Sequence, residues 1–269
     1  SSTAAAKEDV VYTLGAGDFG FTDPTDAAFG NPGNTLAAVT IAELPALGKL
    51  TLNGAEFPAG TSVTALELSA GLLRYLAAPQ ASGDDYATLS FRVQDNGGTD
   101  NGGNNLDAAP RTLTFDVAAI NDRPLGQDNT VTAPESGTKT FQLADFEAGF
   151  SDPQDAPNAN TLAAIRIQLA PARGELRRVG SPTPLAAGAI VARAELLGSQ
   201  LLYVPEANTN GTPYTTFTFF VQDDGGTADG GLDASLNANI MTIDVKDVSQ
   251  APLGDNRTVA TDEDQTYTL

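Results

Sequence analysis

Apolar residues along this chain either alternate with polar ones or form short runs of β-favouring types. The stretches 113–117 (LTFDV) and 241–245 (MTIDV) alternate in this way, with Thr, Val and Phe prominent. Clusters of Gly, Pro, Asn and Asp separate further expected strands at 10–14, 38–41, 49–52, 72–76 and 87–94. Single helical turns are expected at 65–70 and 192–197, too short to form a layer of their own. The pattern predicts an all-β chain.

The chain repeats itself. The segment 91–99 (FRVQDNGGT) returns as 219–227 (FFVQDDGGT). Other matches keep the same order and spacing: 35–39 with 161–165, 48–50 with 174–176, and the pair Tyr75 and Tyr86 with the pair Tyr203 and Tyr214. A third start is visible because 8–14 matches 263–269 by residue class. We therefore expect one repeat at 1–122, a second at 123–250, and the first strand of a truncated third repeat at 251–269.

About seven short strands in a repeat of roughly 120 residues are typical of an immunoglobulin-like or cadherin-like sandwich. The expected fold is a tandem of Greek-key β-sandwich domains. The joints fall at 119–124 (AINDRP) and 247–252 (DVSQAP), directly after the last strand of each repeat. Because proline stiffens these short connections, we expect the domains to stand end to end as a rod.

Charge and missing residue types narrow the function. Asp and Glu number 34 against 14 Lys and Arg, a net charge of -20, which opposes binding to nucleic acid or to an anionic membrane surface and favours cations. The sequence has no Cys and no His, so the usual ligands of zinc, copper and haem, and most catalytic triads, are missing. We expect no enzyme activity. The first residues, 1–6 (SSTAAA), do not resemble a signal peptide, so an export signal is expected outside this sequence.

Acidic turns recur at the ends of the expected strands. The motif Asp-Pro-x-Asp occurs at 23–26, with Asp23 and Asp26, and at 152–155, with Asp152 and Asp155. Proline fixes one backbone angle, and two carboxylates three residues apart can share a cation of the Ca²⁺ type. The alternative for a single motif is an ordinary Asx-turn without metal. Recurrence beside other acidic turns favours calcium.

Three more acidic motifs accompany that turn. They are an early glutamate (Glu8, Glu135, Glu263), a Gln-Asp-Asx-Gly-Gly turn containing Asp95 or Asp223, and the linker pair Asn121 and Asp122. The Gly-rich segments 95–107 and 223–233 offer further oxygen ligands. For these two segments a calcium site of their own and a flexible solvated hairpin both remain open.

With these residues in view, the chain resembles the cadherin-like repeats found in tandem in very large bacterial adhesins of the biofilm and RTX type. The segment 121–124 (NDRP) looks like the cadherin linker, Pro134 and Glu135 like the early Pro-Glu, and Asp152 and Asp155 like the turn. Asp95 and Asp223 resemble the late-strand aspartates. The resemblance implies that calcium binds between successive domains. At the first joint its ligands would be Glu8, Asn121, Asp122, Asp152, Asp155 and Asp223.

The remaining members of this candidate set are Asp23, Asp26, Asp95 and Glu135, which hold the matching positions in the other repeat. Two departures from the cadherin pattern stand out. The second linker reads Ser249-Gln250 in place of Asn-Asp, a poorer ligand set, although Asp247 and Asp255 flank it. The usual Asp-Arg-Glu motif has no clear counterpart in either repeat.

These features predict extender repeats of a bacterial cell-surface adhesin, extracellular and stiffened by calcium, that project a binding domain for cell adhesion or biofilm formation. The partners would be calcium and neighbouring repeats. One alternative is direct binding of polysaccharide or a partner protein, for which only 7% aromatic residues are available. Another is self-assembly into a surface layer or fibre through the strand at the end of the sequence. An internal isopeptide bond would need a core lysine, and Lys49, Lys139 and Lys246 do not occupy matching positions.

Overall fold

The computed structural model describes residues 1–24, 33–249, 251–266 and 268. The candidate ligand Asp26 and the linker residue Gln250 lie outside this described part. The chain forms two compact units. The first comprises Ser1–Leu125, Phe150–Ala163 and Val221–Leu236, and the second Gly126–Gly149, Ala164–Phe220 and Asn237–Leu269.

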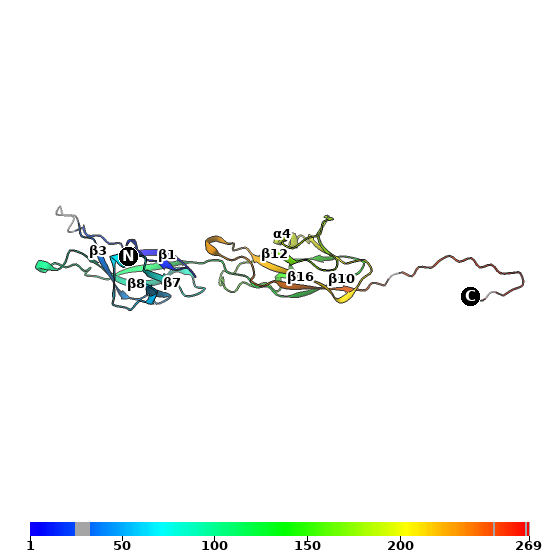
Figure 1. The fold of residues 1–269 in the computed structure, drawn as a ribbon, viewed down its shortest axis with the longest axis horizontal. Helices are drawn as coiled ribbons and strands as arrows, with labels where there is room; N and C mark the ends of the chain where they lie inside the picture. Colours follow the sequence, from blue (N-terminus) through cyan, green and yellow to red (C-terminus); the bar gives the residue numbers. More distant parts are fainter. Residues whose placement is uncertain (25–32, 250, 267, 269) are drawn as a thin grey trace. The chain divides into compact units, whose positions relative to one another are not determined.

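The first unit contains a β-sandwich (Figure 1). One sheet has the order β1-β9-β8-β3-β6 and the other β2-β7-β4-β5. Their strands are β1 (Ser2–Lys7), β2 (Tyr12–Thr13), β3 (Leu36–Glu43), β4 (Lys49–Leu52), β5 (Ala55–Glu56), β6 (Ser62–Thr64), β7 (Leu73–Leu76), β8 (Gly83–Asp95) and β9 (Arg111–Ala118). Strand β1 pairs in parallel with β9, with Ser2 opposite Leu113, while β8 and β9 are antiparallel.

Alternation along the strands builds the core of this sandwich. In β9, Leu113, Phe115 and Val117 are buried while their neighbours are partly exposed, as a half-buried strand requires. The ring of Phe115 stacks on Tyr75 of β7 with centroids 3.9 Å apart. Short helical pieces, η1 (Ala16–Phe19), α2 (Ala65–Ser69) and η2 (Asp100–Gly102), connect the strands.

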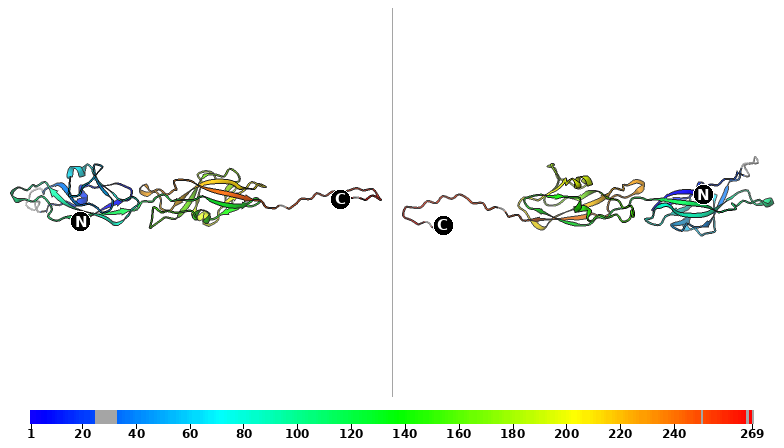
Figure 2. Two further views of the ribbon diagram at one scale, coloured as in Figure 1. Left: turned by 90° about the horizontal axis from the view of Figure 1, so that it is seen from below. Right: turned by 180° about the vertical axis from the view of Figure 1, so that it is seen from behind.

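The second sandwich has sheets in the order β10-β17-β16-β12-β14 and β11-β15-β13. Figure 2 shows its strands from two further sides. They are β10 (Asn129–Pro134), β11 (Lys139–Phe141), β12 (Leu162–Leu169), β13 (Glu175–Arg178), β14 (Ile190–Ala192), β15 (Leu201–Val204), β16 (Gly211–Asp223) and β17 (Asn239–Lys246). Strand β10 pairs in parallel with β17, with Asn129 opposite Met241, as β1 does with β9. The helical pieces are α3 (Ala144–Glu147), α4 (Arg193–Leu197) and η3 (Ala228–Gly230).

A repeated glycine is explained by close packing in both sandwiches. Gly48 and Gly174 adopt the left-handed conformation, with φ of 77° and 69°. A Cβ at either position would lie 2.6 Å from a backbone oxygen of the adjacent strand and within 2.7 Å of the hydroxyl of Tyr75 or Tyr203. These tyrosine hydroxyls donate to the backbone oxygens of Leu47 and Arg173. The glycine and the tyrosine therefore pack against each other in the same way in both sandwiches.

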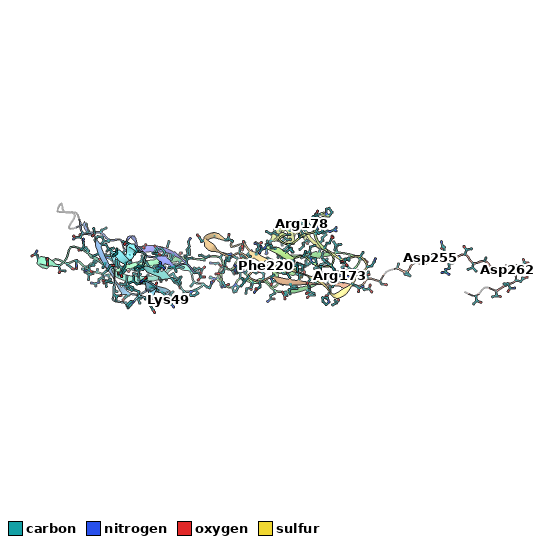
Figure 3. All side chains as sticks on the ribbon, in the orientation of Figure 1. Lys49, Arg173, Arg178, Phe220, Asp255 and Asp262 are labelled. Atoms are coloured by element: carbon teal, nitrogen blue, oxygen red, sulfur yellow. The ribbon has the colours of Figure 1, made fainter. Side chains whose placement is uncertain are left out.

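Several charged side chains make contacts at partly exposed positions. Figure 3 labels Arg173, whose guanidinium lies 3.9 Å from the ring centroid of Tyr214 and 3.4 Å from the Glu206 carboxylate. Lys139 pairs with Asp145 at 3.1 Å at a partly exposed position, and Lys49 is exposed. Neither lysine is in the core, where an isopeptide bond would need it.

The all-β sandwich class predicted from the sequence is confirmed, as are the helical turns near 65–70 and 192–197. The predicted strand at 10–14 is only Tyr12–Thr13, and the longer first strand is β1, which the Ala-rich sequence did not signal. The described residues among 251–268 form no strand, since a strand needs a partner and none of them has one (Figure 2). No helix of the described chain is long and apolar enough to cross a membrane.

Candidate functional site

The acidic residues of the linker and of two loops meet within the first unit. We call residues 152–161 and 223–235 the second loop cluster, and the segment 119–124 that follows β9 the linker. The side-chain amide of Asn121 donates to Asp223 Oδ1 and to the backbone oxygen of Gly226, both at 3.0 Å. Asn160 donates its side-chain amide to Asn121 Oδ1. Asn121 is therefore held by both loops of the cluster.

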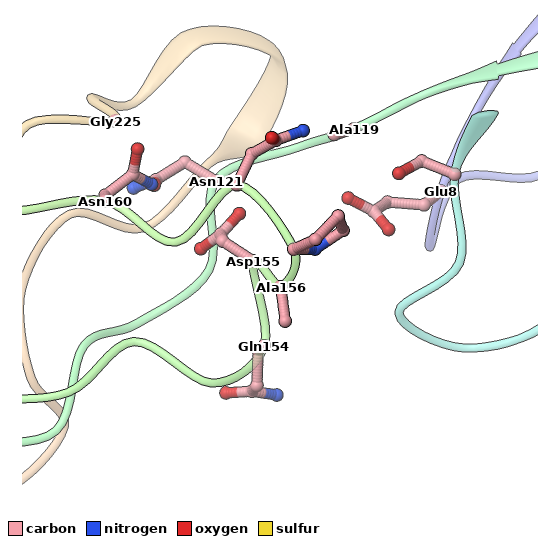
Figure 4. Close-up of a pocket in the computed structure, with 11 residues that line it drawn as sticks. Glu8, Ala119, Asn121, Gln154, Asp155, Ala156, Asn160 and Gly225 are labelled. Carbon is pink, nitrogen blue, oxygen red and sulfur yellow. The ribbon is translucent and has the colours of Figure 1, made fainter. Parts of the chain in front are cut away.

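Two further contacts fix the linker. The backbone N–H of Asp122 donates to Asp155 Oδ2 at 3.0 Å, and the N–H of Ile120 donates to Glu8 Oε1 at 2.7 Å. Glu8, Asn121, Asp155 and Asn160 line an open cleft of ≈ 260 Å³ (Figure 4). Carboxylate and amide side chains are thus lining residues of one cleft.

The Gly-rich loop of the cluster wraps the linker through its backbone. The N–H of Leu232 donates to the backbone oxygen of Asn121 at 2.9 Å, and Arg123 Nη1 donates to the backbone oxygen of Ala234 at 2.8 Å. A Cβ at Gly225 would lie 1.8 Å from Asn121 Oδ1, so only glycine allows this approach. Lys7 adds an ion pair with Asp229 at 2.5 Å.

Two carboxylate oxygens in the cluster are buried without a hydrogen-bond partner. They are Oδ1 of Asp152 and Oδ2 of Asp223, and each residue is only 4% exposed. The other oxygen of each is bonded: Asp152 Oδ2 accepts from Asn160 N at 2.8 Å, and Asp223 Oδ1 accepts from Gly225 N at 2.9 Å. A buried carboxylate oxygen without a partner is costly, and a bound cation would offset that cost.

Burial also shifts the acidity of the cluster. Desolvation raises the pKa of Asp223 to about 6, with a smaller contribution from the nearby charges of Asp152 and Asp233. Burial likewise raises the pKa values of Asp152, Glu8 and Asp122, each with added repulsion from Asp155. In each case the protein disfavours the negative charge. A divalent cation at this place would reverse that balance.

The structure thus brings together Glu8, Asn121, Asp122, Asp152, Asp155 and Asp223, and separates the other candidates. Asp23 and Asp95 lie in the matching loops of the first repeat, where Asp23 Oδ2 accepts from Asn34 N at 2.9 Å. Glu135 lies in the second unit, buried, and its Oε2 accepts from the Asn210 amide at 3.1 Å. Asp26 is outside the described residues. Within the described part of the chain, no group of three or more acidic side chains is gathered closely enough to hold a metal ion as it stands.

Sequence reasoning missed Asn160, Gly225 and Arg123 as parts of this cluster. A signal for the first was present: Asn34 and Asn160 each precede the repeated Thr-Leu-Ala-Ala segment. At Gly225 the decisive factor is the approach of the Asn121 side chain, which the repeated Gly-Gly pair does not reveal. Arg123 gave no signal, because a lone arginine next to proline carries no pattern.

No family model matches the chain, and no curated protein matches its sequence. Solved structures similar to it include human CDH23 EC21-23, at 12% identity and a TM-score of 0.38, covering 91% of this chain and 72% of that one. Human mucin-like protocadherin EC1-2 has 11% identity, a TM-score of 0.36, and coverage of 92% and 96%. Drosophila N-cadherin EC1-4 has 12% identity, a TM-score of 0.38, and coverage of 91% and 50%.

Proposed function

We propose that this chain is a calcium-stiffened extender segment of a bacterial cell-surface adhesin, without catalytic function, that projects a binding domain for adhesion or biofilm formation. The observation that carries the proposal is the pair of buried, unpartnered carboxylate oxygens on Asp152 and Asp223 beside the linker. Two such oxygens are costly in a protein that has no cation to bind. They suit a hard cation whose ligands are oxygens.

The residues that would hold Ca²⁺ are Glu8, Asn121, Asp122, Asp152, Asp155 and Asp223. Four of them are carboxylates whose burial or mutual repulsion raises their pKa, so the cluster as a whole gains from a positive charge. The ion would offset this repulsion and cross-link the linker to the loops. Outside a cell calcium is millimolar, which is enough for a weak site of this composition.

Calcium would act on stability through linkage. A ligand that binds only the folded state stabilises it by about 2.7 kcal/mol at a hundredfold excess over its Kd. We therefore expect calcium to raise the melting temperature of the chain and to narrow the distribution of maximum dimensions measured by small-angle X-ray scattering. Magnesium should do less, because it requires a tighter octahedral site.

The test compares melting and scattering in calcium with those in excess EDTA. The double variant Asp122→Asn and Asp152→Asn removes two negative charges from the proposed site while keeping side-chain volume. The control is Asp23→Asn, since Asp23 Oδ2 accepts from the Asn34 N–H as Asp152 Oδ2 accepts from the Asn160 N–H, and Asp23 is not among the residues proposed to hold calcium beside the linker. The calcium response should be lost in the double variant and kept in the control. A wild-type chain that does not respond to calcium in either measurement rules out the stiffening role.

A further inference from the structure

The outer face of the second sandwich pairs an arginine with an aromatic ring. The guanidinium of Arg166 in β12 lies 4.9 Å from the ring centroid of Phe220 in β16, which Figure 3 labels. Along β16 the odd-numbered side chains of 215–221 are buried, so Thr216, Thr218 and Phe220 point away from the core in one row. A ring and a cation therefore lie on the side of the sheet that faces away from the core.

Polar groups continue the row toward an open groove. The Thr218 hydroxyl donates to Gln168 Oε1 of β12 at 3.0 Å. Thr216 and Arg173 line a groove of ≈ 490 Å³. From Phe220 to Thr216 the strand spans about 13 Å, at about 3.3 Å per residue. We call this surface the β16 face, and its members are Arg166, Gln168, Thr216, Thr218 and Phe220.

The first sandwich lacks this combination of residues. In the second, Ile190 lies opposite Arg166 and is 50% exposed, which adds apolar surface beside the ring. The matching positions of the first sandwich are polar: Thr40, Arg92 and Ser62 stand where the second has Arg166, Phe220 and Ile190. The hydroxyls of Thr40 and Ser62 lie 2.7 Å apart. The same strands thus pair in both sandwiches, so the fold does not require the arginine and the ring.

The charge of the second sandwich suits an anionic ligand. Residues 126–149, 164–220 and 237–246 hold seven Lys and Arg against eight Asp and Glu, so nearly all of the net charge of -20 lies elsewhere in the chain. Four of the five arginines in these segments form ion pairs with glutamates, whereas among the described residues no carboxylate pairs with the fifth, Arg166. Its guanidinium N–H donors are therefore available to a ligand.

We propose that the β16 face binds an extended acidic polysaccharide, with a uronate carboxylate on Arg166 and the apolar side of a sugar ring against Phe220 and Ile190. The planar guanidinium matches a carboxylate with two parallel hydrogen bonds. Thr216 and Thr218 offer hydroxyls to those of the sugar. An extended peptide fits less well, because it pairs its backbone with a sheet edge and not with a sheet face.

The test is an NMR titration of the full chain with tetragalacturonate in EDTA, so that no calcium ion bridges sugar and protein. The amide signals of Thr218 and Phe220 should shift and saturate. The fully methyl-esterified oligosaccharide, which lacks the carboxylate charges, should bind about tenfold more weakly, as should the variant Arg166→Thr. The control is Arg92→Thr, which removes an arginine from the matching strand β8 of the first sandwich and should leave the affinity unchanged.

Several results would overturn the proposal. One is the absence of saturable shifts at Thr218 and Phe220. Another is an equal loss of affinity in Arg166→Thr and Arg92→Thr, which would show unspecific attraction between charges. A third is equal binding of the methyl ester. Signals that shift with protein concentration before sugar is added would identify the β16 face as an interface between copies of the chain. Because every arm is run in EDTA, none of these results bears on the calcium response.

Discussion

Residues 23–24, 33–35 and 95–107 of the first repeat, here called the first loop cluster, have backbone bonds and conformations that match those of the second loop cluster, but their environment differs. In the second, Asp223 is 4% exposed and held by Asn121, whereas its counterpart Asp95 is only half-buried. The loop sequences do not cause this difference, since both run Gln-Asp-Asx-Gly-Gly. Among the described residues the linker covers the second cluster and supplies amide donors to it. In the second cluster the pKa of Asp223 is raised because a second segment helps to remove its carboxylate from water.

The largest effect is expected from a methyl group added at Gly225, where the second loop cluster contacts the linker. In Gly225→Ala the new Cβ would lie 1.8 Å from Asn121 Oδ1 and 2.4 Å from Asn160 Nδ2, so the linker must move. We expect a loss of about 1–3 kcal/mol in the free energy of unfolding, as for other overpacked sites. Denaturant unfolding in EDTA measures it.

The matched control is Gly97→Ala in the first cluster. There the nearest atoms are Asn34 Nδ2 at 2.5 Å and Asp95 Oδ1 at 3.0 Å, both farther away than the 1.8 Å contact at Gly225. Its cost should be clearly smaller. Equal losses at the two positions would show that the loop alone, and not the linker contact, sets the demand for glycine.

Titration offers a second comparison. In the absence of calcium the folded chain binds a proton at Asp223 more tightly than the unfolded chain does, because its pKa is raised from the usual 3.8 to about 6. Stability from this group therefore falls as the pH rises from about 4 to about 6, by at most about 1.4 kcal/mol per pH unit. Calcium should reduce this decrease of stability with pH, since it favours the ionised carboxylate.

Asp223→Asn removes this titration. In EDTA the unfolding free energy of the variant should therefore decrease less between pH 4 and pH 6 than that of wild type. The corresponding Asp95→Asn change is the control. Other groups make stability rise with pH, such as Asp107, whose pKa is lowered by Arg111. Their contributions cancel when each variant is compared with wild type. An unchanged slope in Asp223→Asn would mean that Asp223 is better solvated in solution than its burial indicates.

A smaller effect is expected from the arginine of the linker. Arg123→Ala removes the hydrogen bond from Nη1 to the Ala234 backbone oxygen and should cost about 0.5–1.5 kcal/mol in unfolding free energy. Exchange of the Leu232 amide in the same loop should speed up with it. Arg111→Ala, which breaks an exposed pair with Asp107 in the first cluster, is the control and should leave Leu232 unaffected.

The fold was predictable from the sequence to a large extent, and the candidate site only in part. Strands such as β9 follow from alternation, and repetition drew attention to Asp152 and Asp155, which the structure places in the loops beside the linker. Strand β1 was missed because Ala-rich sequence has little β-preference, and its position depends on parallel pairing with β9. The role of Arg123 depends on a backbone oxygen more than a hundred residues away, to which no local pattern refers.

The smallest effect should come from the ion pair between Lys7 and Asp229. Its N–O distance is 2.5 Å, but the two side chains are 42% and 55% exposed, and exposed pairs contribute about 0–1 kcal/mol. Lys7→Ala should therefore lower the melting temperature only slightly, and 0.5 M salt should remove the difference from wild type. If Lys7→Ala instead matched Gly225→Ala, the Gly-rich loop that carries Asp229 would be held in place chiefly by charge and not by its contacts with the linker.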